Sequence, residues 1–126
     1  MLINLSNHPY KYWLEGQIMI AKREFGEVID LPFPDINPEA KPAGIKAAAE
    51  KYTEKIIRLS EKYNDTNKPF AVHLMGEMTF SFALVSMLLK KDIRCVASTT
   101  ERITEQKDTR KISEFRFVRF RDYKLL

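Results

Sequence analysis

Hydrophobic residues fall into two kinds of run that alternate along the chain. Short runs of apolar or alternating residues are typical of strands, which we predict at residues 1–5, 27–31, 70–75, 93–97 and 111–123. Longer runs, with apolar residues at every third or fourth position, predict helices over residues 12–25, from residue 39 or 42 to about 63, and over 80–91. The chain therefore alternates strands and helices and ends with two consecutive strands.

This order predicts the fold class. Strands separated by helices run parallel, and right-handed crossovers allow a doubly wound sheet in the order 2-1-3-4-5. No helix precedes the last strand, so we expect it to return antiparallel to the fourth strand and to form one edge. The 126 residues fit a single α/β domain, residues 1–126, with three Rossmann-like layers and a mainly parallel sheet.

Polar residues follow three of the predicted strands. In the order 2-1-3-4-5 the chain leaves the first and third strands in opposite directions, which opens a crevice at their carboxyl ends. Ligands of open α/β sheets bind in such crevices, often at helix N-termini. We therefore expect the functional site where three polar segments converge: Ser6-Asn7-His8, Gly76-Glu77-Met78-Thr79 and Ser98-Thr99-Thr100-Glu101-Arg102.

Three connecting segments are predicted to be loops. Residues 32–38 are rich in proline and should form a rigid loop. Residues 64–69 have no tendency towards helix or strand. Residues 104–110 are strongly charged, and we predict that they form a mobile loop between the last two strands.

Composition narrows the classes of protein. The one cysteine, Cys95, excludes an internal disulfide and fits a reducing, cytoplasmic location. We find no basic-then-apolar leader and no apolar run of the roughly 20 residues that would span a membrane. The net charge of +4 permits an anionic ligand, but the basic residues of the last third alternate with aromatic residues instead of clustering. We therefore expect a compact anion rather than a long nucleic acid.

His8 is the candidate for proton transfer. It follows the first predicted strand, and its imidazole can serve as a general acid, a general base or a phosphate donor. The alternative is that Asn7-His8-Pro9 shapes a turn in which the imidazole bonds to the backbone. Ser6 and Asn7 could hydrogen-bond a phosphate or a base edge, or form that turn. Arg102 could bind a phosphate through two parallel bonds, or lie on the surface.

The other chemically notable side chains have structural interpretations. Glu77 could bind an adenine amino group or a ribose hydroxyl, or it could cap the third helix. His73 lies within a strand and is expected to be a buried histidine with its hydrogen bonds satisfied, and Cys95 an inert core residue. Gly76 could be needed only for a tight turn.

Several common sites are missing from the sequence. Two histidines, one cysteine and no close-spaced set of carboxylates predict neither a zinc nor a calcium site, so no metal is expected. G-x-G-x-x-G, G-x-x-x-x-G-K-[ST] and G-x-S-x-G motifs are absent, and no cofactor is implied. What remains is a small Rossmann-like sheet that binds a nucleotide-type anion through hydroxyls, amides and a few basic groups.

The polar segments resemble those of the CRISPR-associated Rossmann-fold (CARF) group, especially its small stand-alone members. Ser6, Asn7 and His8 match the segment after the first strand, Gly76-Glu77-Met78-Thr79 the motif after the central strand, and Arg102 is a looser match. Members of this group are homodimers that bind cyclic oligoadenylate, and some, the ring nucleases of type III CRISPR antiviral defence, cleave it without metal. The lysine often found near the ligand has no clear counterpart here.

The resemblance implies a simple reaction. A 2′-hydroxyl of the ligand attacks its own phosphodiester, while His8 moves a proton and Arg102 faces the phosphate with the backbone amides near Gly76. The ligand contacts would come from Ser6, Asn7, the segment 76–79 and Ser98, Thr99 and Thr100. Three other functions stay open: a module that senses or sequesters the nucleotide without cleaving it, an adaptor that pairs with a partner through the edge strand 115–123, and an enzyme that acts on another small molecule.

Overall fold

The sheet has the strand order predicted from the sequence. A computed structural model describes residues 1–64 and 67–126, which form one sheet in the order β2-β1-β3-β4-β5. The strands are β1 (Leu2–Ser6), β2 (Val28–Asp30), β3 (Ala71–Met75), β4 (Cys95–Lys107) and β5 (Arg110–Asp122). All neighbouring pairs are parallel except β4 and β5, so the predicted fold class is confirmed. Of the predicted loop 64–69, residues 65 and 66 lie outside the described part of the chain.

The helices begin and end close to the predicted positions. They are α1 (Glu15–Phe25), α2 (Pro42–Lys62) and α3 (Met78–Lys90), with a 3₁₀ turn η1 (Tyr10–Tyr12) before α1. The first helix begins later than predicted because residues 10–12 form this separate turn. Gly26 ends α1 with φ of 86°, and Pro42 begins α2, where a missing amide proton costs nothing. Among the described residues, no helix has the length and apolarity that crossing a membrane requires.

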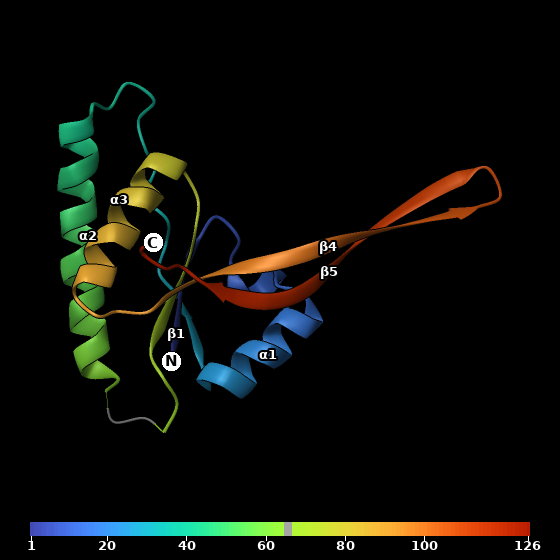
Figure 1. Cartoon of the computed structure of the whole chain (residues 1–126), viewed down its shortest axis with the longest axis horizontal. Helices are drawn as coiled ribbons and strands as arrows, with labels where there is room; N and C mark the ends of the chain where they lie inside the picture. Colours follow the sequence, from blue (N-terminus) through green and yellow to red (C-terminus); the bar gives the residue numbers. More distant parts are fainter. Residues whose placement is uncertain (65–66) are drawn as a thin grey trace.

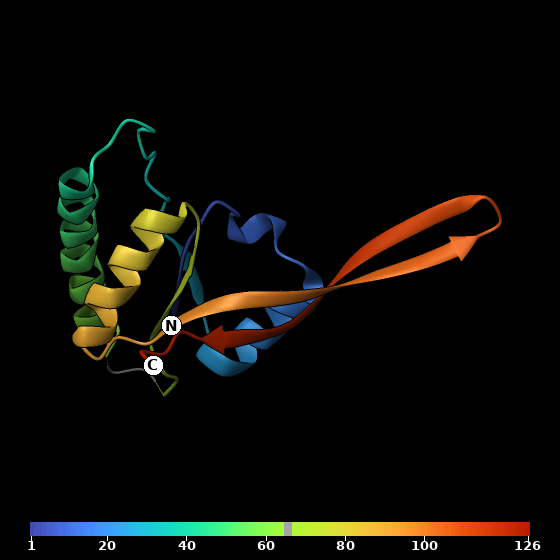
Figure 2. The ribbon, with the colours of Figure 1, turned by 45° about the horizontal axis from the view of Figure 1, so that its top comes forward.

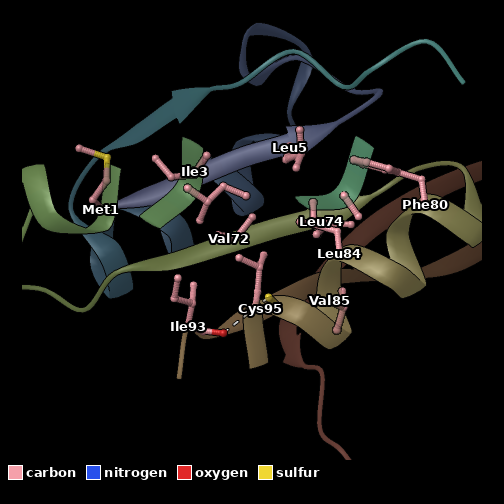
Figure 3. Close-up of a cluster of buried hydrophobic side chains, with 13 residues drawn as sticks. Met1, Ile3, Leu5, Val72, Leu74, Phe80, Leu84, Val85, Ile93 and Cys95 are labelled. Carbon is pink, nitrogen blue, oxygen red and sulfur yellow. Dashed lines mark hydrogen bonds between the residues drawn. The ribbon is translucent and has the colours of Figure 1, made fainter. Parts of the chain in front are cut away.

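Side chains along each strand point alternately to the two faces of the sheet, and helices cover both faces, so the molecule has three layers. Helices α2 and α3 cover one face of the sheet and α1 the other (Figures 1 and 2). Ile3, Leu5, Val72 and Leu74 pack towards α2 and α3 in the larger hydrophobic core (Figure 3). The residues that alternate with them along each strand face α1. There Leu2 forms a second core with Trp13, Phe25 and Phe120 among others. Burial on both faces explains the almost continuous apolar runs of the central strands.

The start of α3 differs from the prediction. The helix was expected to begin at residue 80, but it begins at Met78, and Glu77 is its N-cap, as one of the two interpretations of Glu77 expected. The Glu77 carboxylate accepts hydrogen bonds from the backbone N–H groups of Thr79 (3.1 Å) and Phe80 (2.8 Å) and from the Thr79 hydroxyl. Glu77 therefore satisfies amides that the sequence interpretation assigned to a bound anion.

The fourth strand is much longer than predicted. It was expected to end at Ala97, but β4 continues through the presumed polar segment 98–102 to Lys107. The predicted mobile loop 104–110 is likewise wrong, because it forms the end of β4, a tight turn and the first residue of β5. Asp108 occupies the turn with φ of 56°, a left-handed conformation that aspartate tolerates better than most residues. Residues 101–116, here called the arm, project from the body as a mostly exposed hairpin (Figures 1 and 2).

Gly76 is required by a close approach rather than by a special backbone angle. The ring of Phe33, in the proline-rich loop after β2, lies where a Cβ of residue 76 would be. That ring also packs edge-on against Phe80 at a centroid distance of 5.3 Å. The glycine therefore lets the loop after β2 close onto the turn between β3 and α3.

Gly76→Ala should lower the free energy of unfolding by about 1–3 kcal/mol, because the new methyl group displaces the Phe33 ring. Phe33→Leu shortens that side chain, so the double variant should be less destabilised than the sum of the two single variants. Urea unfolding of all four proteins measures this coupling. Strictly additive effects would show that the ring does not limit residue 76.

Candidate active site

Three polar residues on neighbouring strands lie side by side on the face that α1 covers. Asn4 of β1 is the register partner of His73 of β3, and His73 pairs with Val96 of β4. Ser98 follows Val96 by two residues and therefore lies on the same face as His73. Asn4, His73 and Ser98, here called the polar row, cross three strands near their carboxyl ends. Asn4 and His73 are each only 2 % exposed, so their polar atoms need partners within the protein.

The orientation of the Asn4 amide follows from its partners. Its Nδ2 donates to the His8 carbonyl oxygen at 2.9 Å and to Asp30 Oδ1 at 2.8 Å, and both of these atoms can only accept. Its Oδ1 must then be the atom that faces His73 Nδ1 at 2.9 Å and the Ser6 hydroxyl at 2.8 Å. His73 is consequently protonated on Nδ1, and its Nε2 carries a lone pair.

The other end of the polar row is oriented in the same way. The backbone N–H of Leu14 donates to Gln17 Oε1 at 3.2 Å, so Gln17 Nε2 is the atom that donates to Ser98 Oγ at 3.0 Å. Ser98 Oγ lies 2.7 Å from His73 Nε2. Because that nitrogen has only a lone pair, the Ser98 hydroxyl donates to it. The result is a directed chain of hydrogen bonds from Gln17 through Ser98 and His73 to Asn4.

His73 is held in its neutral form. The rings of Trp13 and Phe120 pack edge-on against it at centroid distances of 5.0 and 5.7 Å. Burial, and to a smaller extent the charge of His8, lowers the pKa of His73 to about 4. The imidazole is therefore uncharged at neutral pH, with its basic nitrogen bonded to Ser98.

A cavity of about 510 Å³ lies over this network at the carboxyl ends of β1, β3 and β4. Its volume falls within the range of about 300–1,000 Å³ typical of small-molecule sites. The polar side chains that line it are neutral hydrogen-bonding groups and two imidazoles: Ser6, Asn7, His8, Gln17, His73, Ser98 and Thr100. Leu14, Met75 and Gly76 complete the lining.

His8 makes the backbone bond that the turn interpretation expected, and it also lines the cavity. Its Nε2 lies 2.9 Å from the Tyr12 carbonyl oxygen, so this nitrogen donates and the imidazole is bonded to the backbone as the turn interpretation expected. The side chain is nevertheless exposed and lines the cavity. With Nε2 engaged, Nδ1 is the nitrogen through which His8 can exchange a proton with a ligand.

The structure brings only part of the predicted site together. Of the predicted residues, the cavity is lined by Ser6, Asn7, His8, Gly76, Ser98 and Thr100. Met78 is 83 % exposed and lines a second, mostly apolar cavity of about 330 Å³ beside α3, which shares Met75 and Gly76 with the first. Thr99 is directed to the opposite face of β4 from Ser98, and its hydroxyl donates to the Arg119 carbonyl oxygen.

Three charged residues of the predicted segments, Glu77, Glu101 and Arg102, also lie outside the cavity lining. Glu101 forms an ion pair with Arg116 at 3.9 Å. Glu77 caps α3, and hydrogen bonds from Phe80 and Thr79 lower the pKa of its carboxyl group; Thr79 itself is bonded to Glu77. Arg102 lies in the arm, two residues beyond Thr100 on the same strand, and its Nη2 donates to the Ser113 hydroxyl at 3.1 Å. The predicted convergence of three polar segments therefore holds for the first segment and for parts of the other two.

The hydrogen-bonded network at the centre of the site was not predicted from the sequence. Asn4 and Gln17 were not considered as site residues, and His73 was interpreted only as a satisfied buried histidine, which it also is. A signal was present: Asn4 and His73 are the polar residues inside two otherwise apolar central strands. Whether these two residues lie side by side depends on the register of the parallel strands, and a single sequence does not reveal that register.

A comparison with protein-family models gives one match. The model described as "Uncharacterized protein MJ1673 family" covers residues 1–121. The chain belongs to this family. No curated protein and no solved structure shows a significant match to it. In this member of the MJ1673 family, the described residues contain no group of three or more His, Cys, Asp or Glu side chains arranged to hold a metal ion.

The low pKa of His73 should make the MJ1673-family fold sensitive to acid. Between pH 6.5 and 4 the unfolded chain binds a proton at His73 that the native protein does not, so stability falls as the pH falls through this window. At pH 5 we expect this one group to have removed about 2 kcal/mol of the free energy of unfolding present at pH 7.

Urea unfolding of the wild type and of His73→Gln at pH 7 and pH 5 measures the effect. Glutamine does not titrate, so the variant should lose the part of the pH dependence that comes from His73. An identical pH dependence in the two proteins would contradict a depressed pKa of His73.

Proposed function

We propose that this protein binds a cyclic oligoadenylate second messenger in the cytoplasm and cleaves it through attack of a 2′-hydroxyl on the adjacent phosphodiester. The observation that carries the proposal is the cavity between the carboxyl ends of β1 and β3, where the strand order reverses. Its lining combines hydroxyl and amide groups, which suit a base and a ribose, with two imidazoles, which suit proton transfer.

The lining favours one nucleotide unit per chain. A cavity of about 510 Å³ is too small for a whole ring of several nucleotides but suits a single nucleotide. A cyclic ligand with two-fold symmetry would then require a second copy of the chain, related by the same symmetry. The homodimer is therefore part of the proposal.

The reaction needs little from the protein. Attack by the 2′-hydroxyl forms a 2′,3′-cyclic phosphate and releases the 5′-oxygen, so the protein must orient the sugar and move protons. His8 lines the cavity with Nδ1 available and is the residue that accepts or donates a proton. Arg102, two residues beyond Thr100, would reach the phosphate by exchanging its bond with Ser113 for one with the ligand.

His8→Ala should slow cleavage of cyclic tetra- or hexa-adenylate by about 100-fold or more, the usual contribution of one acid or base. The test incubates purified protein with each ring in the presence of a chelator and separates the products by chromatography. Lys51→Ala, an exposed position on α2, is the matched control and should cleave at the wild-type rate.

The alternatives correspond to distinct results. Binding without conversion by the wild type would assign a sensor or sequestering module. The absence of both binding and conversion would rule out the nucleotide function.

A second candidate function is the adaptor that pairs with a partner through the edge strand 115–123. It draws support from β5 and from the arm that β5 forms with β4, and the partner considered is a second copy of the chain. An isolated two-stranded hairpin is only marginally stable in water, yet the arm projects without cover from the rest of the chain (Figure 1). It exposes large apolar side chains, among them Ile112 at 48 % and Phe115 at 59 %. These features suit pairing of the arm with a second copy of the chain.

Ile112→Ser combined with Phe115→Ser should weaken self-association at least tenfold, because each apolar side chain contributes about 1.5–3 kcal/mol when buried in an interface. Sedimentation velocity over a range of concentrations measures the change. Thr104→Ser with Glu105→Gln, at exposed polar positions of the same arm, is the control. An unchanged association constant would remove the arm from the interface.

A further inference from the structure

Ser98 is half-buried and lines the cavity, whereas the other two members of the hydrogen-bond network in the lining, Gln17 and His73, are only 6 % and 2 % exposed. The Ser98 oxygen accepts from Gln17 Nε2 at 3.0 Å and donates its proton to His73 Nε2 at 2.7 Å, which leaves one lone pair. Ser98 lines the cavity. Because the Ser98 hydroxyl bonds directly to the basic nitrogen of the buried His73, a ligand in the cavity can exchange a proton with that nitrogen through Ser98.

His73 is arranged to receive a proton at that nitrogen. Its Nδ1–H is held by Asn4 Oδ1 at 2.9 Å, and Asn4 is itself held by Asp30 and by the His8 carbonyl oxygen. A proton arriving at Nε2 therefore leaves the bond to Asn4 in place. Proteins activate hydroxyl groups by the same arrangement: the hydroxyl is hydrogen-bonded to an imidazole, and the imidazole is hydrogen-bonded to a group that orients it.

We propose that Ser98 takes the proton of the attacking hydroxyl and passes its own proton to His73, and that His8 protonates the leaving oxygen. This inference rests on the proposed function and assigns His8 one of its two possible roles. Ser98 and His8 touch the reacting atoms, whereas His73 and Asn4 act through Ser98.

The proton transfers balance. The ligand 2′-hydroxyl gives its proton to Ser98 Oγ while the Ser98 proton moves to His73 Nε2. The 2′-oxygen bonds to phosphorus, and the bond from phosphorus to the 5′-oxygen breaks. The 5′-oxygen takes a proton from Nδ1 of the His8 imidazolium, which gives a 2′,3′-cyclic phosphate and a 5′-hydroxyl. His73 then returns its proton through Ser98 to water, and His8 takes one up from water.

The assignment of His73 as the proton acceptor rests on its bond of 2.7 Å to the Ser98 hydroxyl. A base must be neutral before the reaction, and His73 is neutral because burial lowers its pKa to about 4. The ionisable groups linked to it are His8, whose charge lowers this pKa, and Asp30 of β2, which bonds to Asn4. The groups that α1 and β5 place against the network, Gln17 and Phe120, are uncharged.

Single-turnover cleavage of cyclic tetra-adenylate with a chelator, measured from pH 4 to pH 8, tests the relay. Ser98→Ala should lower the rate by about 100-fold or more, while the affinity for the ring, measured by calorimetry, changes only slightly. The wild-type rate should fall towards pH 4 as His73 becomes protonated, and this acidic limb should be absent from Ser98→Ala and His73→Gln. Lys51→Ala, at an exposed position on α2, should match the wild type.

Each result bears on the relay. Circular dichroism at each pH identifies any variant that unfolds, and Ser98→Ala, at a half-buried position, provides the test if His73→Gln does not fold. Wild-type rates and pH profiles in both variants would overturn the relay and leave the cleavage proposal standing. Binding without cleavage by the wild type would overturn the relay and leave a receptor. Absence of both binding and cleavage would overturn the relay together with the proposed function.

Discussion

The need to satisfy buried polar groups in the central strands determines the site. Asn4 and His73 lie in the interior of a sheet covered on both faces, where an unpaired polar group costs about 1–3 kcal/mol. They are register partners on adjacent strands, and each has a polar atom that the other can use. His73 still needs a donor for its second nitrogen, and Ser98 supplies it from β4. Satisfying these groups therefore requires β1, β3 and β4 to stand in one register.

The same bonds give the cavity its chemical character. The backbone N–H of Leu14 and the His8 carbonyl orient the two amides, the amides orient His73 and Ser98, and a hydroxyl bonded to a neutral imidazole lines the cavity. The α3 N-terminus offers fewer free backbone N–H groups to the cavity than its place in the fold suggests, because the Glu77 carboxylate accepts hydrogen bonds from those of Thr79 and Phe80. The polar groups that line this cavity are neutral donors and acceptors and two imidazoles, whereas Arg102 lies further along β4 and is bonded to Ser113.

Sequence patterns predicted the sheet but only part of the site. Strand order and parallelism follow from local periodicity and crossover handedness, and both are confirmed. The extension of β4 was missed because its residues in the arm are mostly exposed and show no apolar alternation. Gly76 was assigned to a turn, although its requirement comes from Phe33, more than forty residues away in the chain. His73, Asn4 and Gln17 could not be joined because their bonds depend on register and on the placement of α1.

The central claim is that the polar row and His8 form one ligand site. Imidazole ¹⁵N spectra recorded at pH 7 during a titration with cyclic tetra-adenylate test it most directly, since the two histidines give separate signals. We expect His73 to be neutral with its proton on Nδ1, and both imidazoles to shift as the ring is added. A charged His73, a proton on Nε2, or signals from both rings that do not respond to the ligand would contradict the account.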